Sequence, residues 1–269
     1  MLRCAAAVCL ALSTGFALAA DTVTTAGTTI DDGQTTIVVS NDEGKLLYAV
    51  NHERSLQRFS PCSTFKIPNA LIALQHGSLP RHDTTLRYDA LRDPRQDWWP
   101  RRWDQDHTLA SAMRYSVVWY FQELARRSGS ALMQKSLDDF DYGNRDISSG
   151  IDQFWLSGSL RISAAEQVTF LRAFHAGRLG LFETDTEQVK EALLIDVGDG
   201  WELHAKTGGC ELEGERFLGW YVGFVESPGS AVFFALNTEA DTWQGVQARR
   251  LQLLQHTLQQ AGFWPEDQD

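Results

Sequence analysis

Apolar and polar positions alternate in the two-residue period of β-strands at both ends of the chain. Residues 35–50 read TTIVVSNDEGKLLYAV, two such runs around an Asn-Asp-Glu-Gly turn in which Gly44 can take positive φ. Further along, WELHAKTGG, FLGWYVGFVE and SAVFFALNTE are three more strand-like runs separated by turn residues. The pattern predicts a hairpin near the N-terminus and three strands near the C-terminus.

The middle of the chain follows the longer period of an amphipathic helix. LASAMRYSVVWYFQELARRSG, SAAEQVTFLRAFHAG and TEQVKEALLI have helical spacing between Gly, Ser or charged breaks, and residues 246–261 repeat it before Gly262. The simplest architecture is an antiparallel sheet built from both chain ends, with helices inserted between them. We therefore expect one α/β domain of the α+β type over residues 21–269, its sheet from about 21–60 and 200–269 and its helical region from about 64–199.

The first twenty residues, MLRCAAAVCLALSTGFALAA, have the pattern of a secretory signal peptide. A basic start at Arg3 precedes an apolar run that is too short to span a bilayer, and the run ends in small residues. A buried helix is the alternative, but residues 21–25 turn polar at once. We expect a periplasmic or secreted mature chain without a membrane anchor, since nothing later in the sequence resembles a span.

The mature chain is acidic. The formal charge is 24 − 35 = −11, and loss of Arg3 makes it 23 − 35 = −12. An acidic chain without a basic cluster disfavours nucleic acid and anionic lipid, which favours small-molecule chemistry. Cys4 and Cys9 leave with the signal peptide, so Cys62 and Cys210 remain in a compartment that permits disulfides. The seven histidines show no metal-ligand spacing, and we expect no metal site.

The stretch SPCSTFKIPNALIAL, residues 60–74, carries the first candidate chemistry. A helix here would place Ser63 and Lys66 on one face, as a nucleophile and its base require, with free N–H groups of the first turn facing a developing oxyanion. A capping serine and a solvated lysine are the simpler interpretation. Phe65, Ile67 and their neighbours nevertheless make the helix apolar nearly all round, which predicts that it is buried. Because an unpaired buried lysine is costly, this pattern favours a functional role for Lys66.

Four further motifs follow in order, each ordinary by itself: Ser116-Val117-Val118, Tyr142-Gly143-Asn144, Phe154-Trp155-Leu156 and Lys206-Thr207-Gly208. Together with the S-x-x-K motif, their order and spacing resemble those of the class D serine β-lactamases, the oxacillinase family. Flanking sequences such as STFKIPNALI and FWLSGSLRIS are also similar to that family. The resemblance covers essentially the whole mature chain. It implies a transpeptidase-like β-lactamase fold, with a central five-stranded antiparallel sheet flanked by helices and an all-helical lobe.

The resemblance implies that the protein opens penicillins and oxacillin-type β-lactams. Ser63 would be the nucleophile that becomes the acyl-enzyme, and Lys66 its base. In that family carbon dioxide or bicarbonate converts this lysine to an N-carboxylate, and no separate cofactor molecule is used. The conversion needs a neutral amine, hence an apolar pocket. The positions that match this pocket are Phe65, Val117 and Leu156, with the Trp155 N–H bonding the carboxylate.

The remaining motif residues match substrate-handling positions. Ser116 would relay a proton to the leaving nitrogen, and Lys206 would tune that relay or attract the substrate carboxylate. Further matches are Thr207 and Arg250 as carboxylate ligands, the N–H groups of Ser63 and Gly209 as the oxyanion hole, and Trp103 at the pocket rim. Arg249 is the alternative to Arg250, because the carboxylate-binding arginine is assigned only by its distance along the sequence from Asn237 and Pro265. Glu166 closes a capping box at residues 163–166 and is given no catalytic role.

Cys62 departs from the family pattern, in which alanine often precedes the nucleophile. The K-T-G strand of the implied fold runs beside the start of the nucleophile's helix, so Cys62 and Cys210 would face each other and form a bridge, with two free thiols as the alternative. Such a bridge resembles one in some class A carbapenemases and suggests carbapenem hydrolysis. A β-lactam sensor domain and a penicillin-binding transpeptidase are the rival functions. The oligomeric state is left open.

Overall fold

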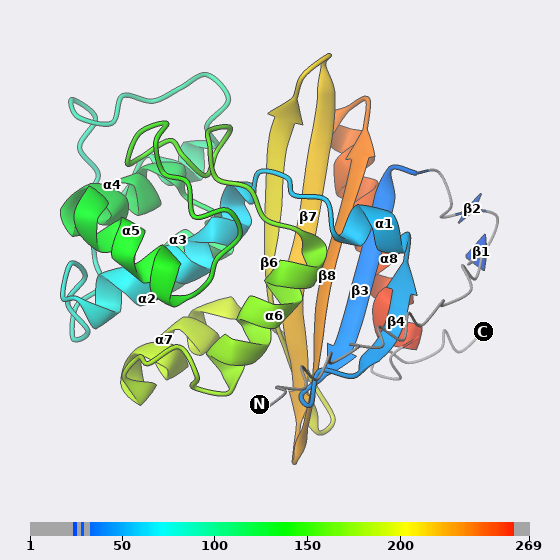
Figure 1. The fold of residues 1–269 in the computed structure, drawn as a ribbon. Coiled ribbons are helices and arrows are strands. Elements are labelled where there is room, and N and C mark those ends of the chain that lie inside the picture. Colours follow the sequence, from blue (N-terminus) through cyan, green and yellow to red (C-terminus); the bar gives the residue numbers. More distant parts are fainter. Residues whose placement is uncertain (1–23, 26–27, 30–32, 261–269) are drawn as a thin grey trace, which may run out of the picture.

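A six-stranded antiparallel sheet with the strand order β4-β3-β8-β7-β6-β5 organises the protein (Figure 1). The computed structural model describes residues 24–25, 28–29 and 33–260. The strands are β3 (Thr35–Asn41), β4 (Leu46–Val50), β5 (Leu194–Gly198), β6 (Trp201–Leu212), β7 (Arg216–Ser227) and β8 (Ser230–Ala240), and short β1 (Thr24–Thr25) pairs separately with β2 (Thr28–Thr29). The N-terminal hairpin thus joins the C-terminal strands through the β3–β8 pair.

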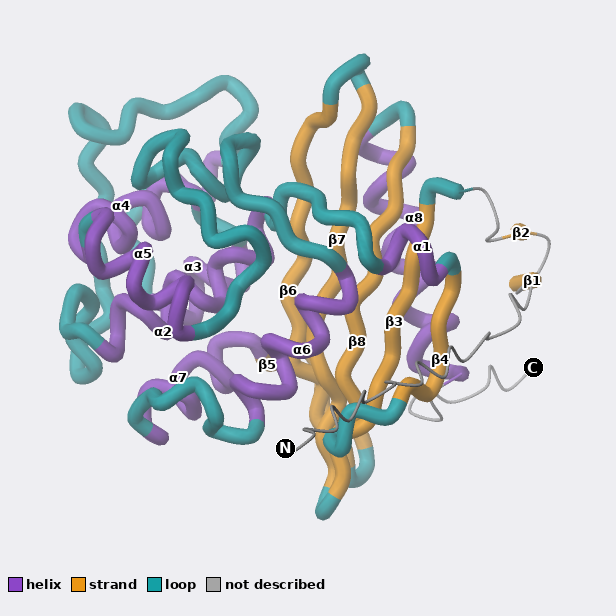
Figure 2. The backbone as a smooth tube through the Cα atoms, in the orientation of Figure 1, coloured by secondary structure: helices purple, strands orange, loops and turns teal. Residues whose placement is uncertain are grey.

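Helices fill the chain between the two strand groups, as the sequence pattern predicts. They are α1 (His52–Ser55), η1 (Cys62–Phe65), α2 (Lys66–Gln75), η2 (Arg101–Trp103), α3 (Leu109–Tyr115), α4 (Val118–Ser128), α5 (Ser130–Asp139), α6 (Ala164–His175), α7 (Glu183–Leu193) and, after the last strand, α8 (Trp243–Gln260). Figure 2 shows α2 to α5 as a lobe beside the sheet. The transpeptidase-like mixed fold is confirmed.

The two faces of the sheet have separate cores. On one face α8 buries Leu253, Leu254 and Leu258 against apolar side chains that include Leu203 and Ala205 of β6. Each such leucine contributes roughly 1.5–3 kcal/mol to folding. The other face packs against α6 and the helical lobe. Because side chains alternate along a strand, residues 204 and 206 of β6 point toward that second layer.

Two sequence predictions need correction. The sheet has six strands rather than five, because α7 ends at Leu193 and the next residues form β5, which pairs with β6 through a turn where Gly200 has φ +80°. TEQVKEALLI therefore begins as helix and ends as strand. The predicted helix over residues 109–129 is two helices, since Ser116 has φ +56° and ends α3.

The sequence prediction of export rests largely on residues that the structure does not describe. The signal peptide, with Cys4 and Cys9, lies outside the described residues, so export stays a prediction. Within the described part of the chain, every helix is too short or too polar to span a bilayer.

Candidate active site

The candidate nucleophile lies where the 3₁₀ helix η1 runs into α2. Ser63 is partly exposed, and Lys66, the first residue of α2, is fully buried with its Nζ 2.8 Å from Ser63 Oγ. Residues 66–74 of α2 are all buried, which explains why the sequence is apolar on every side of this helix. The backbone ahead of η1 is also fixed, because Trp220 Nε1 donates to Ser60 O at 2.9 Å and Ser60 Oγ donates to Trp155 O at 3.0 Å.

Ser116 brings the two lysines of the site together. Lys66 Nζ lies 2.8 Å from both the Oγ and the carbonyl oxygen of Ser116, and Lys206 Nζ lies 3.1 Å from the same Oγ. Ser116 adopts the left-handed conformation, φ +56° and ψ +40°, that few non-glycine residues take. This turn aims the hydroxyl between the lysines, and such strain is typical of functional sites.

Burial sets the charge of both lysines. It holds the pKa of Lys66 well below its usual range, and the nearby Lys206 ammonium lowers it further. The pKa of Lys206 falls to about 7, mainly through burial and then through the positive charge of Arg250. Neither lysine forms an ion pair with a carboxylate of residues 33–260. Lys66 can therefore be a neutral amine at neutral pH, which is what a base or a carbon dioxide acceptor requires.

Aromatic side chains wall the lysine pocket. Phe65 stacks on Trp155 with ring centroids 5.3 Å apart, Val117 is fully buried, and Leu156 is partly buried at the edge of the core. Phe121, which the sequence analysis missed, lies with its ring centroid 5.6 Å from Lys66 Nζ. Trp155 is fully buried, and its indole N–H has no hydrogen-bond partner among the residues described. A buried donor without an acceptor is costly, so this N–H is available to a hydrogen-bond acceptor.

The edge of β6 closes the site opposite Ser63. β5 pairs with β6 only as far as His204, so the following part of the strand is free to lie against η1. The contact is tight, because a Cβ on Gly208 would lie 3.0 Å from Pro61 O. Gly209 also has no room for a side chain, because a Cβ there would lie 2.0 Å from the ring of Trp243 in α8.

A disulfide links these two walls. Cys62 is bonded to Cys210, with the Cα atoms 5.8 Å apart and a sequence separation of 148 residues. The bridge is the one that the sequence resemblance implied. It ties the residue before Ser63 to the strand that carries Lys206, Thr207 and Gly209.

The structure places Arg250 at the K-T-G strand. Arg250 Nη1 donates to Gly208 O at 3.2 Å, and its guanidinium lies 5.8 Å from the Trp243 ring centroid. Trp103, expected at the pocket rim, is 5% exposed and donates its indole N–H to Tyr115 O at 2.9 Å. Its contact with substrate stays a prediction.

Comparison with known proteins identifies the arrangement. Residues 34–253 match the family model described as the penicillin binding protein transpeptidase domain. Beta-lactamase OXA-48 of Klebsiella pneumoniae is 40% identical over 218 residues, 81% of this chain and 80% of that protein. The chain belongs to the class D β-lactamase family. The structure of FUS-1 (OXA-85), a class D β-lactamase from Fusobacterium nucleatum, agrees with a TM-score of 0.77 at 31% identity, covering 85% of this chain and 93% of that one.

A receptor domain is similar as well. The C-terminal domain of the Bacillus licheniformis BlaR penicillin-receptor superposes with a TM-score of 0.79 at 31% identity, covering 86% of this chain and 92% of that one. The shared fold of class D β-lactamases and this receptor therefore does not by itself separate hydrolysis from sensing.

Two other motifs of this class D chain have structural roles. Ser163 and Glu166 form the expected capping box of α6, and Glu166 also pairs with Arg58. In the Y-G-N loop, Tyr142 is fully buried and makes an edge-to-face contact with the Phe65 ring. Asn144 accepts from the N–H of Arg161 at 2.8 Å and donates to Ser159 O at 2.9 Å, which joins this loop to the segment that leads into α6.

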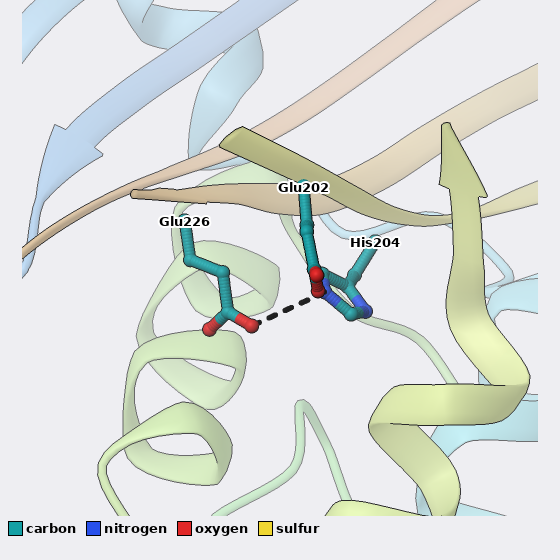
Figure 3. A group of neighbouring side chains, drawn as sticks. All are labelled: Glu202, His204 and Glu226. Atoms are coloured by element: carbon teal, nitrogen blue, oxygen red, sulfur yellow. Dashed lines mark hydrogen bonds and ion pairs between the residues drawn. The ribbon is translucent and has the colours of Figure 1, made fainter. Parts of the chain in front are cut away.

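One group that could hold a metal ion was missed in the sequence. Glu202, His204 and Glu226 each offer one ligand atom, all within 4.8 Å of one another, and Figure 3 shows them converging from β6 and β7. His204 Nδ1 lies 2.9 Å from Lys190 O, and Lys190 Nζ already lies 3.2 Å from Glu226 Oε2. No sequence spacing could reveal the group, because it forms only when β6 pairs with β7.

Proposed function

We propose that this class D β-lactamase hydrolyses penicillins and oxacillin-type β-lactams through an acyl-enzyme on Ser63. The observation that carries the proposal is the position of Lys66, buried without a counter-ion among residues 33–260 and 2.8 Å from Ser63 Oγ. A neutral amine there can take the proton of Ser63 as the hydroxyl attacks the lactam carbonyl. The C–N bond of the ring then breaks, and the nitrogen receives a proton along the path through Ser116.

The other site residues bind the substrate and the charge that develops on it. The N–H groups of Ser63 and Gly209 would stabilise the oxyanion. Thr207 and Arg250 would bind the substrate carboxylate, and the positive charge of Lys206 would add to its attraction. Water then attacks the ester carbonyl, the bond to Ser63 Oγ breaks, and the serine recovers its proton.

We further propose that Lys66 carries an N-carboxylate in the working enzyme. Carbon dioxide would add to the neutral amine with loss of one proton, and the carboxylate formed would replace the amine as general base in both halves of the reaction. The N–H of buried Trp155, which has no partner in the described part of the chain, supports this proposal, since a carboxylate on Lys66 would give it an acceptor. Phe65, Val117 and Leu156 would exclude water, which would otherwise favour return to the protonated amine.

Carbapenem hydrolysis and export complete the proposal. The Cys62–Cys210 bridge fixes η1 against β6, and a rigid site of this kind would tolerate carbapenems. The N-terminal segment supports export to the periplasm. The alternative is a sensor that stops at the acyl-enzyme, which the likeness to the BlaR penicillin-receptor domain supports.

Turnover of a penicillin at about pH 7 separates these functions. The mature protein is assayed in buffer stripped of carbon dioxide and again after bicarbonate is added. Many turnovers that increase with bicarbonate support a hydrolase with N-carboxylated Lys66. A single stoichiometric burst that bicarbonate does not extend would instead support the sensor and remove the proposed role of Lys66 in deacylation.

A further inference from the structure

The strained conformation of Ser116 is held from both sides. On its C-terminal side, Lys66 Nζ donates to the Ser116 carbonyl at 2.8 Å. On its N-terminal side, the carbonyl of Tyr115 accepts the indole N–H of Trp103 at 2.9 Å. The Tyr115 carbonyl is one of those at the end of α3 that have no partner within the helix. Trp103 therefore fixes the peptide plane whose rotation would change φ of Ser116.

A second indole holds the first in place. Trp119, in the first turn of α4, donates its N–H to Trp103 O at 2.8 Å. Both rings are buried, Trp103 at 5% exposure and Trp119 at 0%. The preceding carbonyl, Arg102 O, lies 3.0 Å from His107 Nε2, so two successive carbonyls of η2 are bonded by side chains. The chain of bonds runs from α4 through η2 to the turn at Ser116.

We propose that Trp103 and Trp119 are positioning residues for acylation, which hold the left-handed turn that directs Ser116 Oγ at Lys66 and Lys206. Loss of the Trp103 N–H would leave the Tyr115 carbonyl without the donor that fixes its orientation, and that peptide would then be free to rotate. The same rotation moves the Ser116 hydroxyl away from its short contacts with the lysines. Proton transfer depends steeply on such contacts. The inference rests on the proposed function only in giving Ser116 the proton relay.

Trp103→Phe tests this inference, and Trp99→Phe is its matched control. Trp99 lies in the same aromatic cluster, is 5% exposed, and has an indole N–H without a partner among the described residues. Each substitution keeps a large ring and removes one N–H, but only the first breaks a hydrogen bond. Stopped-flow mixing with a chromogenic β-lactam gives the acylation rate constant and the substrate dissociation constant separately.

We expect Trp103→Phe to lower the acylation rate constant about tenfold while the dissociation constant changes less than about twofold. Trp99→Phe should acylate at the wild-type rate. Trp119→Phe, which breaks only the hydrogen bond to Trp103 O, should also slow acylation. It replaces Trp103→Phe as the test variant if Trp103→Phe does not fold.

Two results would overturn the inference. One is wild-type acylation in both Trp103→Phe and Trp119→Phe, even with a lowered melting temperature. The other is a weaker dissociation constant at an unchanged rate, which would make Trp103 a substrate contact. The proposed function fails separately: a wild-type protein that acylates without turnover is not a hydrolase, yet the comparison of acylation rates still decides the roles of the tryptophans.

Discussion

Lys66 Nζ lies 2.8 Å from Ser63 Oγ at the point where η1 becomes α2. The lysine is fully buried, whereas the serine is partly exposed, so the amine is shielded from water while the serine hydroxyl can contact a substrate. Three acceptors surround the amine, the two serine hydroxyls and the Ser116 carbonyl. A neutral amine has two N–H groups and one lone pair, and only a hydroxyl can donate to that lone pair. The arrangement therefore favours proton transfer from serine to lysine.

Trp155→Phe should weaken the hold on an N-carboxylate without harming the unmodified protein. The substitution removes a buried N–H that lacks a partner among the residues described, so stability in carbon dioxide-free buffer should stay equal or rise. The bicarbonate concentration that gives half-maximal penicillin turnover should rise about tenfold or more, because a hydrogen bond to a charged group is lost. Titrating bicarbonate against the rate measures this, and carbon-13 NMR with labelled bicarbonate reports the modified lysine directly.

Trp99→Phe is again the control, since it too removes a buried N–H that has no partner within the described residues, in the cluster beside η2. An unchanged bicarbonate midpoint in Trp155→Phe would contradict the assignment. So would a labelled carbamate signal that persists undiminished in that variant.

Arg250→Ala should weaken substrate binding, whereas Arg249→Ala should not. Arg250 reaches the K-T-G strand through Gly208 O, and its charge also lowers the pKa of Lys206. Losing a bidentate partner for the substrate carboxylate should raise KM for a penicillin about tenfold or more. Steady-state kinetics on the two variants side by side measure it. A larger KM effect in Arg249→Ala would reverse the assignment.

Loss of the disulfide should cost stability before it costs chemistry. A loop of 148 residues corresponds to roughly 5 kcal/mol in the chain-entropy model, and removal of native bridges typically costs about 2–5 kcal/mol. Denaturant unfolding should therefore show Cys62→Ala and the double variant Cys62→Ala/Cys210→Ala less stable than wild type by about that amount. Reductant should bring the wild type to the same level. Equal carbapenem turnover in Cys62→Ala and wild type would remove the proposed link between the bridge and carbapenem hydrolysis.

The sequence allowed the fold to be predicted because its signals are local or ordered. The strand pairs at both chain ends show clean alternation, and the capping box at Ser163 and Glu166 marks the start of α6 within one turn. The Ser63 and Lys66 pair is also local, since three residues of helix bring the side chains together. The K-T-G strand could be placed beside Ser63 only through the family resemblance, because the two segments are distant in sequence.

The parts that could not be predicted depend on long-range packing. The edge strand β5 continues a helical pattern, and Leu194 changes to strand only because β6 offers it a partner. The positive φ of Ser116 breaks a run that reads as one helix, because Lys66 and Trp103 hold that turn from elsewhere in the chain. The group of Glu202, His204 and Glu226 likewise exists only once two strands pair.

Replacing Lys206 with methionine should stabilise the protein at neutral pH and remove part of its dependence on pH. The pKa of Lys206 is about 7 in the folded protein, below its ordinary value, so from about pH 7 to 10.5 the unfolded chain binds a proton that the folded chain does not. Stability of the wild type therefore rises with pH across this window, by at most about 1.4 kcal/mol per pH unit from this group. Buried Lys66, whose pKa is also lowered, contributes with the same sign, and without the Lys206 charge its pKa would be lowered less, which reduces this contribution in the variant as well.

Lys206→Met should thus exceed wild type in free energy of unfolding at pH 7.5, and the difference should shrink as the pH approaches 10. Urea unfolding at pH 7.5, 8.5 and 9.5 measures this difference, and raised tyrosine pKa values cancel because both proteins share them. The control is Lys135→Met, which removes an exposed lysine of α5 and so reports the effect of losing one positive charge at the surface. A difference for Lys206→Met that stays constant with pH would mean that the folded protein keeps Lys206 protonated. Activity should move the opposite way, because methionine cannot attract the substrate carboxylate, so the variant would be more stable and less active for the same physical reason.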